Sequence, residues 1–126
     1  MIKTTISEII EASSAFAPIM DMSFNGKLSF QVARLARELN KEIVTFDQQK
    51  TKLVEQYGAR EPNGQLVQDE NGNYIISQDN IEVCKQKIED MLKTEVEINA
   101  EYISEDLFNE VSLTPAQAMK ISTFIK

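Results

Sequence analysis

The stretch "KLSFQVARLARELNKEIVTFDQQKTKLVEQYG", residues 27–58, decides the fold of this chain. Apolar residues recur in it every seven positions and have further apolar neighbours beside them: Val32, Leu39, Phe46 and Leu53, with Leu28, Leu35, Ile43 and Tyr57. This spacing places all of them on one side of a helix of about eight turns. Gly58 follows directly and predicts where the helix ends.

A second long helix is predicted to follow a connecting loop. Ser77 is a suitable N-cap, and Asp79 falls in the first turn, where a negative charge is favoured. The expected buried side consists of Ile81, Cys84, Ile88, Met91 and Leu92. Two long helices joined by a returning loop predict an antiparallel pair, and Cys84, the single cysteine, is interpreted as a small core residue.

Shorter elements are expected at both ends of the chain. Thr5 and Glu8 have capping-box spacing, so a helix should start there, after a short strand in "MIKT" and before Pro18. Near the C-terminus, "TPAQ" at 114–117 has the N-cap, first-turn proline and third-position glutamine of a helix start, with Leu113 placed to pack on Ala118. This last helix should pack through Met119, Ile121, Phe124 and Ile125.

One segment has the two-residue rhythm of a strand. In "EVEINAEY", residues 95–102, apolar or small residues alternate with Glu95, Glu97, Asn99 and Glu101. This alternation predicts a strand with one solvated, acidic face. Together these patterns predict a mainly helical α+β fold: an antiparallel pair of long helices, a small antiparallel β element and a short C-terminal helix. We find no internal repeat, so residues 1–126 are expected to form a single domain.

The loop "PNGQLVQDENGNYIIS", residues 62–77, allows three interpretations. A calcium loop is disfavoured because neither possible register supplies the first and last ligands of an EF-hand. A small hairpin turning at Asn71-Gly72 is favoured, since Asn-Gly is the preferred centre of tight turns. Its apolar residues Leu66, Val67, Tyr74, Ile75 and Ile76 would pack on the strand at 95–102 and complete a sheet, or would be buried in another protein.

Composition excludes several classes of function. The 126 residues contain no histidine and one cysteine, which removes imidazole-based triads and the usual zinc sites. We expect no catalytic, cofactor-binding or metal-binding residues. No apolar run is long enough for a membrane span, and the N-terminus does not resemble a secretory signal, so a cytoplasmic location is expected.

Charge is unevenly distributed along the chain. The net charge is −7, yet residues 27–52 carry six basic and three acidic side chains, whereas residues 53–112 carry four basic and fourteen acidic ones. Arg34, Arg37 and Lys41 share a helix face, but Glu38 and Glu42 stand at ion-pairing spacing, which favours a salt-bridged surface over phosphate binding. We see no aromatic residue accompanying them for base stacking.

The order of segments resembles a group of small uncharacterised proteins of tailed phages and prophages. The resemblance lies in "IKTTISEIIEA", "VARLARELNKEIVTFDQQKTKLVEQYG", "KTEVEI" and "SLTPAQAMKISTFI". It implies a phage origin and action inside the host cell, and it transfers no functional residues.

Three functions are compatible with this sequence. The first is a non-enzymatic, acidic phage protein that binds a host or phage protein, for example as an inhibitor of a host or defence protein. The second is a virion structural or assembly component that works as a homo-oligomer. The third is an accessory protein that binds nucleic acid. For the first, the expected partner-binding residues are Leu66, Val67, Tyr74, Ile75, Glu95, Glu97 and Glu101.

Overall fold

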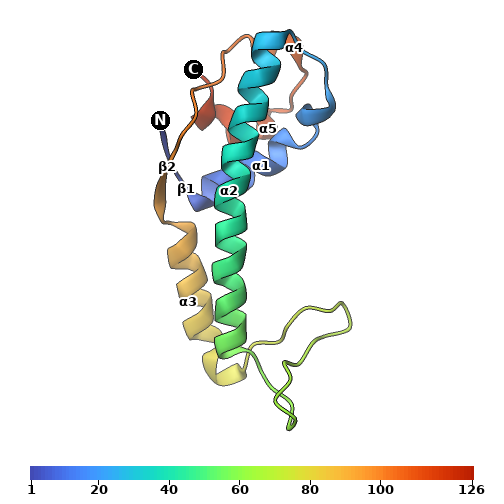
Figure 1. Cartoon of the computed structure of the whole chain (residues 1–126), viewed down its shortest axis with the longest axis vertical. Helices are drawn as coiled ribbons and strands as arrows, with labels where there is room; N and C mark the ends of the chain where they lie inside the picture. Colours follow the sequence, from blue (N-terminus) through green and yellow to red (C-terminus); the bar gives the residue numbers. More distant parts are fainter. The chain divides into compact units, whose positions relative to one another are not determined.

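A computed structural model describes all 126 residues, which form five helices and two strands (Figure 1). Their bounds are β1 (Ile2–Thr5), α1 (Ile6–Phe16), α2 (Gly26–Tyr57), α3 (Ile81–Leu92), β2 (Glu95–Ile98), α4 (Leu107–Glu110) and α5 (Pro115–Ile121). The chain divides into two compact units: unit 1 is Met1–Ile43 with Lys93–Lys126, and unit 2 is Val44–Leu92. The expected fold class is confirmed, whereas the single-domain expectation stays a prediction.

Unit 1 contains the sheet, in which β1 pairs with β2 in antiparallel fashion. Ile2 lies opposite Ile98 and Lys3 lies opposite Glu97, so the apolar residues point to one face and the charged ones to the other. The strand in "MIKT" is therefore confirmed. The second strand is shorter than predicted: it ends at Ile98, and the Ala100 N–H turns back to donate to the Ile98 carbonyl at 2.9 Å.

The core of unit 1 lies between α1, the first half of α2, α5 and the sheet. Four apolar residues at helical spacing on α2 are buried there, namely Leu28, Val32, Leu35 and Leu39. They are joined by fully buried side chains from the other elements: Ile2, Ile9, Ile19, Ile98, Ile103, Leu107, Ile121 and Phe124. Elements distant in sequence thus share one apolar interior, since α1 packs against α5 and β1 pairs with β2.

The caps predicted in unit 1 are present. The Glu8 N–H donates to Thr5 Oγ1 at 3.2 Å at the start of α1. At the start of α5, the Gln117 N–H donates to Thr114 Oγ1 and the Thr114 N–H donates to Gln117 Oε1, which makes a complete capping box. Ile121 and Phe124 are buried as expected, but the packing expected for Met119 is wrong because its side chain is exposed.

In unit 2, residues of the C-terminal half of α2 and α3 form the antiparallel helix pair (Figure 1). Cys84 is the only buried residue of this unit, with an exposed fraction of 3%. The core position predicted for Cys84 is therefore confirmed, whereas the one predicted for Ile81 is wrong. Ser77 stands where a cap was expected, but its side chain makes no capping hydrogen bond, and one turn of 3-10 helix precedes α3. None of the helices combines the length and hydrophobicity of a membrane span.

Two neighbouring threonines should respond in opposite ways to the same substitution. Thr4 is buried and its hydroxyl has no hydrogen-bond partner, whereas the Thr5 hydroxyl caps α1. Thr4→Val should raise the free energy of unfolding by about 1 kcal/mol, because it removes an unsatisfied buried polar atom without changing shape. Thr5→Val should lower it by about 1 kcal/mol through loss of the cap. Urea unfolding followed by circular dichroism measures both, and destabilisation by Thr4→Val would contradict the assignment.

Candidate functional site

The loop between α2 and α3 forms two turns, each with an Asn-Gly step at its tip. In the first turn, the Glu61 N–H donates to the Gln65 carbonyl at 2.8 Å, and Asn63 Oδ1 accepts from the Gln65 N–H at 3.0 Å. Gly64 adopts a φ of +87°, a region that glycine enters without the steric cost of a side chain. Arg60 ties this turn to the end of α2, because its guanidinium donates to the carbonyls of Gly64 and Glu55 at 2.8 and 2.7 Å.

The second turn repeats this design eight residues later. The Asp69 N–H donates to the Asn73 carbonyl at 2.8 Å, and Gly72 has a φ of +81°. Asp69 Oδ1 accepts from the N–H groups of Asn71 and Asn73 at 2.9 and 3.0 Å. The carboxylate of Asp69 therefore works as a turn-forming acceptor for its own backbone.

A ring of three backbone hydrogen bonds closes both turns at their base. The Ala59 N–H donates to the Ile75 carbonyl (2.7 Å), the Val67 N–H to the Ala59 carbonyl (2.9 Å) and the Ile75 N–H to the Val67 carbonyl (3.0 Å). Each of the three residues thus gives one hydrogen bond and receives one. The ring holds the three chain segments together without a regular strand.

This arrangement differs from the single hairpin that the sequence predicts. The ring residues are eight positions apart, as are the two Asn-Gly steps and the pair Leu66 and Tyr74. An eight-residue repeat therefore runs through this loop, contrary to the expectation of no internal repeat. The expected single hairpin is replaced by two turns, and the two-stranded sheet contains β1 and β2 with no strand from the loop.

The loop and α3 together form an apolar surface on unit 2, which we call the loop–helix surface: Tyr74, Ile75, Ile76, Ile81 and Ile88. An open hollow of about 460 Å³ lies here, lined by all of these except Tyr74, with Cys84, Lys85 and Glu89. The exposed fractions of Tyr74, Ile75 and Ile81 are 46%, 42% and 44%. The other two loop residues expected to bind a partner, Leu66 and Val67, are half-buried.

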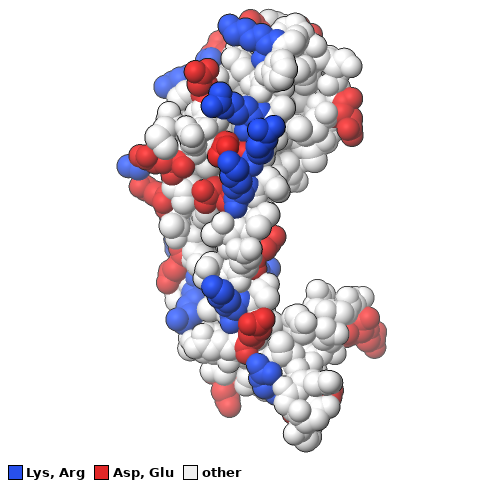
Figure 2. Space-filling view, viewed as in Figure 1, with Lys and Arg blue, Asp and Glu red and all other residues white.

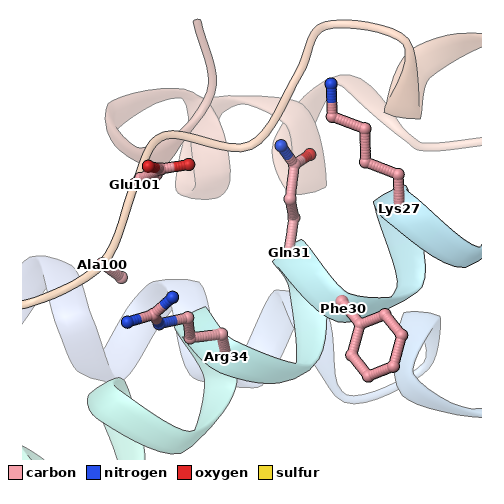
Figure 3. Close-up of a pocket in the computed structure, with 6 residues that line it drawn as sticks. All are labelled: Lys27, Phe30, Gln31, Arg34, Ala100 and Glu101. Carbon is pink, nitrogen blue, oxygen red and sulfur yellow. The ribbon is translucent and has the colours of Figure 1, made fainter.

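The three glutamates expected to form one acidic strand face do not share a face. Glu95 and Glu97 lie on β2, where Lys3 of β1 stands opposite Glu97 and its Nζ is 3.6 Å from Glu95 Oε2. Glu101 lies beyond the end of the strand and lines a separate hollow of about 310 Å³ with Lys27, Phe30, Gln31, Arg34 and Ala100 (Figure 3). The continuous acidic face was therefore a wrong expectation.

The basic face of α2 also differs from the expectation. Lys41 pairs with Glu38, with Nζ 2.8 Å from Oε1, but Arg34 and Arg37 make no ion pair or hydrogen bond. Phe30 lies one turn before Arg34 with an exposed fraction of 78%, so an aromatic residue does accompany the arginines. The sequence could have predicted this, because residues four apart, such as Phe30 and Arg34, lie on the same face of a helix.

No group of three or more His, Cys, Asp or Glu side chains is arranged to hold a metal ion. Comparison of the chain with family models, curated proteins and solved structures gives no match. The resemblance to phage proteins therefore stays a prediction.

Two glycines offer a matched test of the loop base. Gly58 does not have a positive φ; its role is close approach, because a Cβ there would lie 2.5 Å from the Val54 carbonyl oxygen and 2.7 Å from Leu66 Cδ2. Gly58→Ala should therefore lower the free energy of unfolding by about 1–3 kcal/mol. It should also speed hydrogen exchange at the amides of Ala59, Val67 and Ile75, measured by NMR.

Gly26→Ala is the control, since a Cβ at Gly26 meets nothing within 4 Å and alanine favours the helix that begins there. It should leave the loop amides unchanged. Equal exchange rates in the two variants would show that the loop base does not depend on the close approach at Gly58.

Proposed function

We propose that this protein acts by binding another protein, and that the loop–helix surface makes the contact. The observation that carries the proposal is the incomplete burial of unit 2. Its 49 residues from Val44 to Leu92 bury one side chain, Cys84, while three large apolar side chains beside an apolar hollow remain close to half-exposed. Exposed apolar surface grouped in this way is typical of interaction sites.

The energetics favour a partner with apolar side chains. Fully burying a large apolar residue stabilises by about 1.5–3 kcal/mol, so covering the exposed halves of Tyr74, Ile75 and Ile81 would contribute about 1 kcal/mol each. The tyrosine adds a hydroxyl that can form a hydrogen bond at the edge of such a contact. Lys85 and Glu89 border the hollow and provide one charge of each sign, so an uncharged, apolar segment fits the hollow best.

The loop is suited to holding these residues in place. The ring of Ala59, Val67 and Ile75 fixes the backbone from which Tyr74 and Ile75 project, and less conformational entropy is then lost on binding. In the phage setting that the sequence resemblance implies, the partner is a host or phage protein, and occupying its surface is a sufficient mode of inhibition.

A pair of double variants tests the proposal. Ile75→Glu with Ile81→Glu places two charges on the loop–helix surface, whereas Val44→Glu with Val83→Glu places two charges at equally exposed positions that do not line the apolar hollow. The first pair should weaken binding by at least about tenfold, because charged groups would lose water on contact, and the second should leave binding within about twofold of the wild type. The partner is first isolated with the tagged wild-type chain by cross-linking and mass spectrometry, and binding is then measured with the purified partner.

Circular dichroism must show the same helix content in both double variants. Equal binding by both would rule out the loop–helix surface as the contact. The alternative is that a second copy of the chain covers this surface. Light scattering would then show a fixed oligomer for the wild type, and only the Ile75/Ile81 double variant would dissociate it.

A further inference from the structure

A second surface, on unit 1, combines free cations with an exposed aromatic ring. Lys27, Phe30, Arg34 and Arg37 follow one another on α2 at spacings of three, four and three residues, which places them along one side of the helix. We call this set the basic–aromatic surface. It extends over about 15 Å of the helix axis, and Figure 2 shows basic side chains following one another over unit 1.

The cations of this surface are available to a ligand. Lys27, Arg34 and Arg37 are exposed and make no ion pair, hydrogen bond or ring contact within the chain. Glu38 is the carboxylate of α2 that is closest in sequence to Arg34 and Arg37, and it is bound by Lys41. An incoming anion therefore does not have to displace an internal partner from the two arginines or the lysine.

The hollow beside the helix adds a third kind of group. Figure 3 shows Lys27, Gln31 and Arg34 projecting from α2 beside the segment that carries Ala100 and Glu101. Gln31 Oε1 accepts from the Ser104 N–H at 3.4 Å, which orients the side-chain amide and leaves its N–H groups free to donate. The hollow thus presents two cations and a neutral donor, with Phe30 on the flank of the same helix.

The charge pattern distinguishes between anionic macromolecules. Unit 1 carries eight basic and eleven acidic side chains, and Glu101 lies within the hollow itself. A nucleic acid, with a charge on every nucleotide, would bring more negative charge than the three free cations can neutralise, and the surrounding acidic side chains would repel the excess. A peptide with two or three carboxylates matches the number of free cations, and its backbone N–H groups can donate to Glu101.

We propose that the basic–aromatic surface binds a short acidic peptide segment of a partner protein. Carboxylates of the segment pair with Lys27 and Arg34, which stand seven residues and about 10 Å apart along the helix. An apolar side chain of the segment, between those carboxylates, packs on the Phe30 ring. This site is separate from the loop–helix surface and does not depend on it.

The test uses the full chain and a short fluorescein-labelled peptide that contains a central leucine with one glutamate on each side. Fluorescence anisotropy should show saturable binding that weakens by about tenfold or more in the double variant Lys27→Gln with Arg34→Gln. The control, Lys52→Gln with Lys120→Gln, removes the same net charge at two other exposed positions and should change affinity less than about twofold. Absence of saturable binding, or equal loss in both double variants, would overturn the proposal.

A second readout places the peptide at Phe30. The chain contains no tryptophan, so Phe30→Trp introduces a single tryptophan whose emission should shift to the blue when the peptide's leucine covers it. An unchanged emission spectrum at saturating peptide would show that the peptide binds elsewhere. A single-stranded DNA oligonucleotide is titrated in parallel, and tighter binding of the oligonucleotide with the same dependence on Lys27 and Arg34 would overturn the peptide assignment in favour of nucleic acid.

Discussion

The structure depends on one difference along α2: its apolar side is buried from Leu28 to Leu39 in unit 1 but only partly buried in unit 2. Apolar residues continue along one side of α2 from Leu28 to Tyr57, but the extent to which they are buried changes. Leu28, Val32, Leu35 and Leu39 are buried in unit 1, whereas Phe46, Leu53 and Tyr57 in unit 2 are only partly buried. Burial stabilises in proportion to the apolar area removed from water, so unit 1 holds most of the stabilising core. A unit of 49 residues is small to support a core of its own.

This difference separates two kinds of surface. Unit 1 has a closed interior, and what it offers outside is charge: Lys3 beside Glu95 on the sheet, and the unpaired Lys27, Arg34 and Arg37 on α2. Unit 2 offers incompletely buried apolar side chains on a loop held by main-chain hydrogen bonds. The two surfaces therefore suit partners of different chemistry.

Several features that depend on neighbours in sequence could be predicted, although the side-chain cap expected at Ser77 does not form. The capping box at Thr114 and Gln117, the N-cap at Thr5 and the extent of α2 follow from local rules and agree with the structure. Features that depend on distant neighbours could not be predicted. Lys3 meets Glu95 only because two strands ninety residues apart pair in one register, and Glu101 leaves the strand face because the backbone turns back at Ala100. The pairing of Glu38 with Lys41 rather than with an arginine is likewise a choice among several allowed spacings.

The two-turn loop separates a hydrogen-bonded base from two exposed tips. Each tip satisfies its backbone groups with its own side chains, Asn63 in one and Asp69 in the other, and the ring at the base consists only of main-chain atoms. Tip residues that neither bond the turn backbone nor adopt a positive φ, such as Glu70, can therefore be exchanged with little effect on the base. Changes confined to the tips would therefore leave this main-chain frame in place, as loops vary on the rigid sandwich of an antibody domain.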